Sequence, residues 1–195
     1  MGEKAIAATQ PDGNMSLDLK IEQVKQYPTK DGEVTEILLK DKVYPFEIKQ
    51  YYKAYQGTDI ISTWIEIMNN GKKSVTLYRF VSAYLPVQRG DNWLTHFHGH
   101  WGAENMLEEE KLTNGQKVIS NKDGMVNTET DNPSFMLSID GKPQEEYGHI
   151  LGGTLAWTGN YLLKMDITNT KLNIIAGINE ENSHYKLEPK ETFKT

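Results

Sequence analysis

The chain contains no cysteine among its 195 residues, so it forms no disulfide bond and offers no thiolate to a metal ion. No apolar run approaches the roughly 18 residues that a membrane span needs, and the first eight residues lack the long apolar core of a signal peptide. Basic residues are not clustered, and the net charge is −6. We therefore expect no nucleic-acid partner and no membrane, and the sequence indicates no compartment.

Sustained helical periodicity is absent as well, and short segments of alternating apolar and polar residues take its place. Residues 15–22, 46–52 and 61–68 alternate in this way, and turn sequences such as Asn-Gly and Asp-Gly separate such segments. Residues 75–85 have apolar groups on both faces, which predicts a central strand. Residues 121–133 are polar, and we expect a long loop there. Many short strands between turns predict an antiparallel all-β sandwich.

Three of the five histidines, His96, His98 and His100, lie in one short stretch. Residues two apart on a strand share a face, so the three imidazoles would project together, with Glu104 a short way downstream. The pattern is compatible with a metal site, with an acid–base cluster or with packing on a half-buried strand. Same-face neighbours on one strand are roughly 6–7 Å apart, so three in a row do not readily surround one tetrahedral ion, and we expect no metal.

The chain is rich in aromatic residues, with four tryptophans and ten tyrosines. Trp93 and Trp101 flank the histidines, and Trp157 opens the segment Trp-Thr-Gly-Asn-Tyr. An aromatic plane can stack on the apolar face of a sugar ring, but large aromatics also fill sandwich interiors or cover an interface. For the segment at Trp157, a tight strand turn set by Gly159 and Asn160 is the alternative to a functional role. The residues alone leave both interpretations open.

Several motifs occur in a fixed order along the chain. They are Asp-Ile-Ile-Ser-Thr-Trp-Ile-Glu-Ile-Met-Asn from Asp59, Gly-His-Trp-Gly-Ala-Glu from Gly99, Ser120 with Gly124 and Asn132-Pro133, Trp-Thr-Gly-Asn-Tyr from Trp157, and Gly-Ile-Asn from Gly177 with Leu187 and Glu191-Thr-Phe193. In this order and spacing they resemble the N-terminal domain of the bacterial α-galactosidases of glycoside hydrolase family 36. The resemblance runs from about residue 60 to the C-terminus. It departs from the family where an arginine is usual, because Ala103 and Asn105 flank Glu104.

The resemblance implies a β-supersandwich of galactose-mutarotase-like architecture, placed ahead of a (β/α)8 barrel that carries both catalytic aspartates. We therefore expect residues 1–195 to form a single sandwich domain, part of a larger N-terminal domain, with no catalytic residue and no cofactor. Its partners would be the barrel of the parent chain and further copies in a homo-oligomer. The parent would hydrolyse terminal α-galactosides with retention. The candidates for contact with carbohydrate or with an interface are Trp93, His96, His98, His100, Trp101, Glu104, Trp157 and Asn160.

Two other functions stay open at this stage. A free-standing carbohydrate-binding module would bind sugar as an isolated chain. A mutarotase-like aldose epimerase, a class that shares the sandwich architecture, would use a histidine and a glutamate as acid and base. We also expect open sheet edges and an exposed apolar or aromatic surface that the rest of the parent enzyme covers, with Trp93, Trp101 and Trp157 as its candidate residues.

Overall fold

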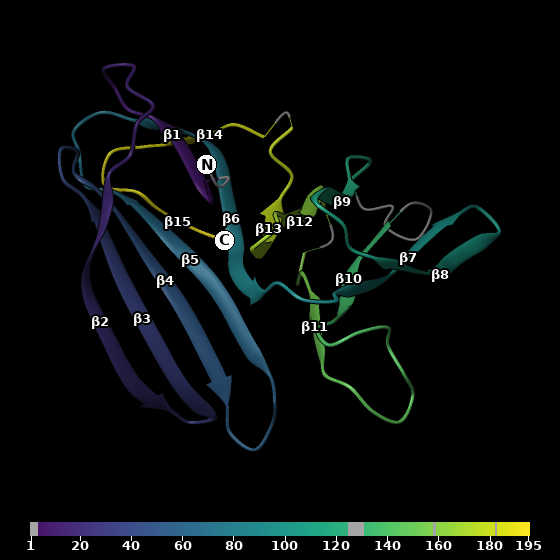
Figure 1. Cartoon of the computed structure of the whole chain (residues 1–195). Coiled ribbons are helices and arrows are strands. Elements are labelled where there is room, and N and C mark those ends of the chain that lie inside the picture. The colour runs from purple at the N-terminus through teal and green to yellow at the C-terminus, as the bar shows by residue number, and fades with distance from the viewer. Residues whose placement is uncertain (1–3, 125–130, 158, 182) are drawn as a thin grey trace. The chain divides into compact units, whose positions relative to one another are not determined.

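The computed structural model describes residues 4–124, 131–157, 159–181 and 183–195, which form an all-β protein (Figure 1). The strands are β1 (Ile6–Thr9), β2 (Leu19–Thr29), β3 (Gly32–Asp41), β4 (Phe46–Tyr55), β5 (Ile61–Asn69), β6 (Val75–Gln88), β7 (Trp93–His100), β8 (Ala103–Lys111), β9 (Gly115–Asn121), β10 (Asp131–Ser138), β11 (Ile150–Thr154), β12 (Tyr161–Ile167), β13 (Lys171–Ile178), β14 (Tyr185–Leu187) and β15 (Thr192–Lys194). Neighbouring strands pair antiparallel, which confirms the predicted fold class.

The chain divides into two compact units. The terminal unit consists of residues 2–83 and 183–195, and the middle unit consists of residues 84–182. Strand β6 continues from the terminal unit into the middle unit. Within the described ranges no helix has the length and hydropathy of a membrane span.

The terminal unit contains a five-stranded sheet in the order β15-β5-β4-β3-β2 (Figure 1). Its alternating strands bury one face, where Phe46, Ile48 and Ile67 are almost fully excluded from water. On the last strand, the Phe193 ring lies 5.1 Å from the Phe80 ring of β6 in an edge-to-face arrangement, so aromatic packing joins this sheet to β6.

Within the terminal unit, β6 has a partner on each side, because β1 and β14 both pair with it. Phe80 and Val81, which point to opposite faces of the strand, are both buried. The prediction of a central strand over residues 75–85 is confirmed.

Strand β2 is an edge of the five-stranded sheet, and nearly all of its side chains are exposed. Its pairing with β3 slips between Ile21 and Gln23, and it contains Lys25 and Pro28. A bulge, a lysine and a proline are features that discourage another strand from pairing with an open edge. The predicted open edge exists, but its sequence limits what can add to it.

The middle unit contains a four-stranded sheet in the order β11-β10-β7-β8 and the strands β9, β12 and β13. β12 pairs along its whole length with β9 and with β13, and Tyr161, Leu163 and Met165 on it are buried. The expected loop over residues 121–133 is wrong at both ends, because Asn121 belongs to β9 and residues 131–133 belong to β10, while residues 125–130 lie outside the described part of the chain. Pro133 lies where the pairing of β10 with β7 is irregular, which a residue without an N–H tolerates.

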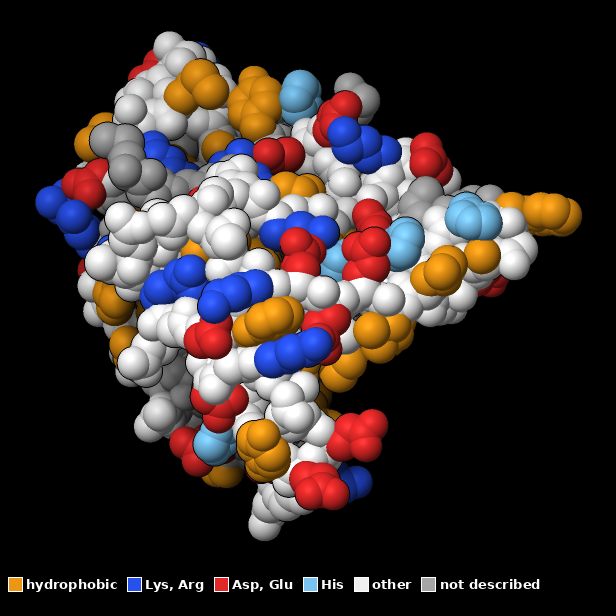
Figure 2. Space-filling view, turned by 45° about the vertical axis from the view of Figure 1, so that its right-hand side comes forward, with side chains coloured by type: hydrophobic (Ala, Val, Ile, Leu, Met, Phe, Trp, Pro, Cys, Tyr) orange, Lys and Arg blue, Asp and Glu red, His pale blue; other side chains and the backbone are white. Residues whose placement is uncertain are grey.

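Acidic and basic side chains are mixed on the face of the molecule shown in Figure 2, and hydrophobic side chains occur there singly or in small groups. Many of the charges are paired, as in the contacts of Lys53 with Asp31, Lys111 with Asp91 and Lys142 with Glu109. Such exposed pairs contribute little to stability.

Candidate functional site

The histidine stretch forms β7, and its pairing with β8 places His96 opposite Glu108. His96 is only 2% exposed, and its Nε2 lies 3.3 Å from Glu108 Oε2 and 3.5 Å from Glu110 Oε1. His98 Nδ1 lies 3.6 Å from Glu108 Oε1. The structure thus brings two of the three histidines to the same carboxylate.

The electrostatic environment keeps His96 neutral. Burial lowers its pKa, and the charge of Lys117 lowers it further, whereas Glu108 and Glu110 act in the opposite direction. Lys117 Nζ lies 2.5 Å from Glu110 Oε1 and compensates that charge. Neither nitrogen of the His96 ring has a well-aligned hydrogen-bond partner among the described residues. A neutral imidazole excluded from solvent is poorly placed to exchange a proton with a substrate.

His100 and Glu104 lie near the tip of the β7–β8 hairpin, outside this cluster. His100 is exposed, and its Nδ1 lies 3.0 Å from the carbonyl oxygen of the following residue. The pairing slips near the tip, and Asn105 has a φ of 53°, so β8 accommodates an extra residue as a bulge. Glu104, beside the bulge, is exposed. The expected grouping of three histidines with Glu104 is therefore limited to the first two histidines.

Two of the candidate tryptophans have very different surroundings. Lys142 Nζ lies 5.6 Å from the ring centre of the half-buried Trp93, so a lysine occupies one face of that ring. Trp101, which follows β7 at the hairpin tip, is 82% exposed. No hydrogen bond or ring contact fixes the Trp101 side chain in the part of the chain that the structure describes.

A second group of candidates lies where β9, β12 and β13 meet. Asn121, Tyr161 and Ile178 form one row across these strands. Asn179 follows the row, is buried, and donates from Nδ2 to the carbonyl oxygens of Asn121 and Tyr161, at 3.2 Å in each case. Asn121 in turn donates from Nδ2 to the Gly124 carbonyl at 2.7 Å. Buried side-chain amides thus bind backbone carbonyls near the ends of these strands.

Trp157 and Asn160 belong to the same group. Asn160 Oδ1 accepts from the Gly124 N–H at 2.8 Å, and its carbonyl accepts from the Asn179 N–H at 3.1 Å and from Trp157 Nε1 at 3.2 Å. The buried Tyr161 hydroxyl, whose pKa is raised by burial, donates to a backbone carbonyl at 2.6 Å. Three of the motifs that carry the family resemblance, around Gly124, Trp157 and Gly177, therefore meet at one end of the strands β9, β12 and β13.

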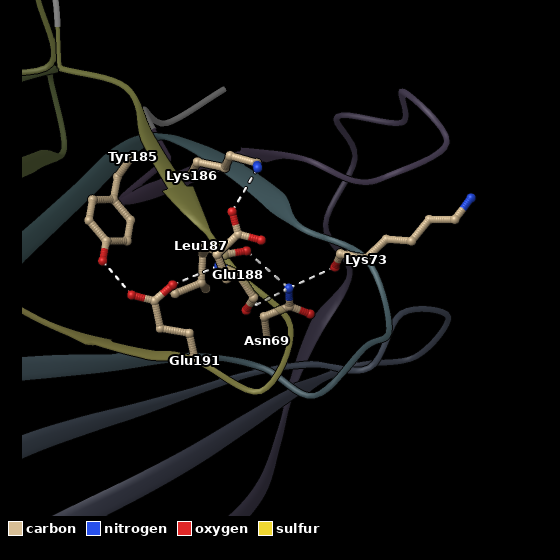
Figure 3. A network of polar contacts seen from close by, with 7 residues as sticks. All are labelled: Asn69, Lys73, Tyr185, Lys186, Leu187, Glu188 and Glu191. Carbon is tan, nitrogen blue, oxygen red and sulfur yellow. Dashed lines mark hydrogen bonds and ion pairs between the residues drawn. The ribbon is translucent and has the colours of Figure 1, made fainter.

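The terminal unit contains a comparable centre at Asn69, the last residue of the motif that begins at Asp59, which the sequence analysis did not single out as a candidate (Figure 3). Asn69 is 2% exposed, and its Nδ2 donates to the carbonyls of Lys73, Leu187 and Glu188 at 2.9, 3.1 and 3.2 Å. Its Oδ1 accepts from the Gly71 N–H at 3.0 Å. This side chain joins the end of β5 to the last residue of β14 and to the residue after it.

Sequence reasoning also missed the acidic and basic partners of the histidines. The sequence analysis singles out none of Glu108, Glu110 and Lys117. A usable signal was present, because the hairpin pairs β7 with β8 and a residue on β7 can be matched to its neighbour by counting back from the turn. Lys117 comes from β9, and no local pattern points to it.

These contacts indicate what each region can do chemically. Among the residues placed in the structure, no group of three or more His, Asp or Glu side chains is arranged to hold a metal ion. The two acidic side chains nearest His96 are already paired with lysine or histidine. The amides at the two strand ends bind the protein's own backbone. The acidic side chains and the amides of these regions are therefore engaged with other groups of the protein.

The chain belongs to the glycosyl hydrolase family 36 N-terminal domain family, whose profile matches residues 1–188. It is 25% identical over 166 residues to the α-galactosidase AgaA of Geobacillus stearothermophilus, covering 85% of this chain and 22% of that protein. It is 27% identical over 201 residues to the α-galactosidase Mel36A of Lactobacillus acidophilus, covering 95% of this chain and 27% of that protein. The chain thus spans about a quarter of the length of these relatives.

The fold is also found in solved structures. The crystal structure of the Geobacillus stearothermophilus α-galactosidase AgaA superposes on 100% of this chain and 29% of its own, with a TM-score of 0.93 and 23% sequence identity. The α-galactosidase from Lactobacillus brevis gives a TM-score of 0.88, also at 23% identity, over 100% of this chain and 28% of its own. Both show that the sandwich is the architecture of these N-terminal domains.

Proposed function

We propose that this chain is the non-catalytic N-terminal β-region of an α-galactoside hydrolase and supports a catalytic (β/α)8 barrel in the parent enzyme. The single observation that carries the proposal is the convergence of the family motifs around Asn179. Their polar groups are bound to one another and to backbone, which suits a rigid support better than a reaction centre. The names of the relatives, all α-galactosidases, supply the activity of the parent.

The chemistry of the reaction supports a separate catalytic part. Retaining glycosidases use two carboxyl groups about 5–5.5 Å apart, one as nucleophile and one as acid–base. Glu108 and Glu110 both lie near His96, and both belong to the edge strand β8. The charge of Glu110 is compensated by Lys117. Nothing in this arrangement resembles a pocket that could hold a sugar between two free carboxyl groups.

The remaining expectations extend the same proposal. Residues 1–195 act together as one β-sandwich portion of a larger N-terminal domain that precedes the barrel. The exposed strand β8 at a sheet edge supports contacts between copies in a homo-oligomer. His98, His100, Trp93 and Glu104 are candidates for such interfaces or for contact with the barrel.

Activity assays test the proposal directly. The 195-residue chain should release nitrophenol from a nitrophenyl α-galactoside only at the background rate, whereas the product of the complete reading frame that encodes it should turn the substrate over. Activity of the purified short chain that follows the protein through chromatography would contradict the proposal, as would an inactive complete product. Acceleration of galactose anomerisation by the short chain, lost in Glu108→Gln, would favour a mutarotase-like enzyme instead.

A further inference from the structure

The indole of Trp157 is held rigidly while much of it faces water. Its Nε1 donates to the Asn160 carbonyl at 3.2 Å. A Cβ placed on Gly159 would lie 2.9 Å from Nε1 and 3.0 Å from Cε2 and Cζ2, so the ring packs directly against the glycine backbone. Trp157 is nevertheless 48% exposed. The ring therefore has backbone on one side and solvent on the other, and no rotamer has to be frozen when something stacks on it.

A directed hydrogen-bond donor lies beside this ring. The Asn160 side chain is oriented by the Gly124 N–H, which donates to Oδ1 at 2.8 Å. The bond to Oδ1 fixes which way the amide is turned and therefore where its Nδ2 lies. None of the described residues accepts a hydrogen bond from Nδ2. An amide that is oriented but still has two N–H groups to give can bind a hydroxyl oxygen of a ligand.

Charged residues adjoin Gly124, which binds the Asn160 side chain. Asp123, which directly precedes Gly124, has an exposed carboxylate. Lys122 and Glu181 form an ion pair next to it. A half-exposed aromatic plane with an oriented amide beside it, and with charged residues next to the glycine that binds this amide, matches a pyranose ring, which offers one C–H face and a rim of hydroxyl groups. A protein partner would instead be expected to cover a continuous apolar patch.

We infer that Trp157 and Asn160 form a saccharide-binding site, separate from any catalytic centre, that takes one pyranose ring of a galactoside. The C–H face of the sugar stacks on the indole, a hydroxyl oxygen accepts from Asn160 Nδ2, and another hydroxyl donates to the Asp123 carboxylate. The choice of galactose rests on the proposed function, whereas the site itself rests on the geometry. Trp101 is the matched contrast, since it is more exposed and no hydrogen bond or ring contact among the described residues fixes its ring.

Nuclear magnetic resonance of the 195-residue chain tests the inference. The chain has four tryptophans, so four indole N–H signals are available, and Trp157→Phe assigns the relevant one. Titration with methyl α-galactopyranoside should shift the Trp157 signal, and methyl α-glucopyranoside should act more weakly. Trp157→Ala should weaken binding about tenfold or more, whereas Trp157→Tyr should retain most of it. Asn160→Asp keeps the acceptor for Gly124 but removes the donor, and should weaken binding several-fold.

Trp101→Ala is the control and should bind the sugar as the unaltered chain does. The remaining indole signals show whether each variant is folded. Equal affinity in Trp157→Ala, or no shift at the highest soluble sugar concentration, would overturn the inference. A Trp157 signal that moves with protein concentration and not with sugar would overturn it in favour of a protein interface. None of these outcomes depends on α-galactosidase activity, so the site can fail while the proposed function stands.

Discussion

The two units use the same side chain at a strand end for different purposes. In the terminal unit, the Asn69 side chain donates from Nδ2 to backbone carbonyls and accepts at Oδ1 from a backbone N–H (Figure 3). In the middle unit, Asn179 does the same for Asn121 and Tyr161, but the neighbouring Asn160 keeps its Nδ2 available and Trp157 remains half exposed. The first centre is closed, and the second is open on one side.

The difference shows how a sandwich can carry a surface without losing stability. A strand that ends inside the protein leaves carbonyl groups that water cannot reach, and a buried amide supplies the missing donors. Because the Asn179 side chain already binds the buried carbonyls, the side chains of Asn160 and Trp157 are not needed for that purpose. The backbone of Asn160 is itself held by the Asn179 N–H and binds Trp157 Nε1. If this comparison is correct, damage to the closed centre affects stability alone, whereas damage to the open centre also affects what the surface binds.

The largest expected effect is that of Asn69→Ala. It removes three donor contacts and leaves buried carbonyls without partners, which should lower the free energy of unfolding by about 3 kcal/mol. For a protein of this size, that loss corresponds to a decrease of roughly 6–12 °C in the midpoint of thermal unfolding. Differential scanning calorimetry measures it. Sugar binding at temperatures where the variant is folded should not change.

Two further variants control this result. Asn70→Ala removes a neighbouring amide that is exposed, so its midpoint should stay within about 1 °C of the unaltered chain. Asn179→Ala removes two donor contacts instead of three and should cost less than Asn69→Ala. If Asn69→Ala and Asn70→Ala unfold at the same temperature, the closed centre does not stabilise the terminal unit as argued here.

Sequence reasoning predicted the elements around Asn69 but not its role. The strand alternation followed from local patterns and is confirmed. The hairpin that Asn70-Gly71 predicts is wrong, because β5 pairs with β4 and β15, whereas β6 pairs with β1 and β14. The partners of the Asn69 amide at Leu187 and Glu188 lie 118 and 119 residues away, and they were not visible because they are backbone carbonyls that any residue type provides. Alternating patterns predict which face of a strand is buried. They do not predict which strand ends lie next to each other, and contacts such as those of Asn69 depend on that.

The same limit applies to the candidate site. Trp157 and Asn160 were recognised as one turn, because Gly159 and the flanking residues are a local signal. That Gly124 and Asn179 bind the same turn became visible only with the pairing of β12 to both β9 and β13. The bulge at Asn105 was missed for a different reason. Asparagine tolerates a positive φ but also occurs at many ordinary positions, so the residue type alone does not predict a bulge.

Gly159→Ala tests the open centre with a smaller change. The added methyl group would overlap the indole of Trp157, which has to move away and give up its bond to Asn160. Because the ring can swing into solvent, we expect a loss of only about 1 kcal/mol in unfolding free energy. The Trp157 indole N–H signal should shift strongly, and sugar binding should fall. Fluorescence emission should move to longer wavelength as the ring becomes more hydrated.

The matched control is Gly152→Ala on β11, where the nearest atom to the added methyl group would be 3.9 Å away, an ordinary contact distance. It should leave the Trp157 signal in place. If Gly159→Ala leaves the indole signal and the sugar affinity unchanged, then the ring is not held by the turn and the open centre loses its defining feature.

His96 provides the smallest effect and the sharpest contrast with the asparagines, because it is a buried polar side chain that lacks well-aligned partners in the described structure. Its pKa is lowered in the folded state, mainly by burial, so the unfolded chain takes up the proton first as the pH falls through the ordinary histidine value near 6.5. The unfolded state then binds more protons, and stability decreases with falling pH. Replacing it by His96→Gln removes this contribution. Between about pH 7.5 and pH 5.5 the variant should therefore lose less unfolding free energy than the unaltered chain, by up to about 1 kcal/mol, as measured by urea unfolding at both pH values.

The control is the exposed His100, and His100→Gln should leave the pH dependence of the unfolding free energy unchanged. The opposite sign, with the unaltered chain gaining on the variant at low pH, would mean that Glu108 and Glu110 outweigh burial and that His96 becomes a charged partner of β8.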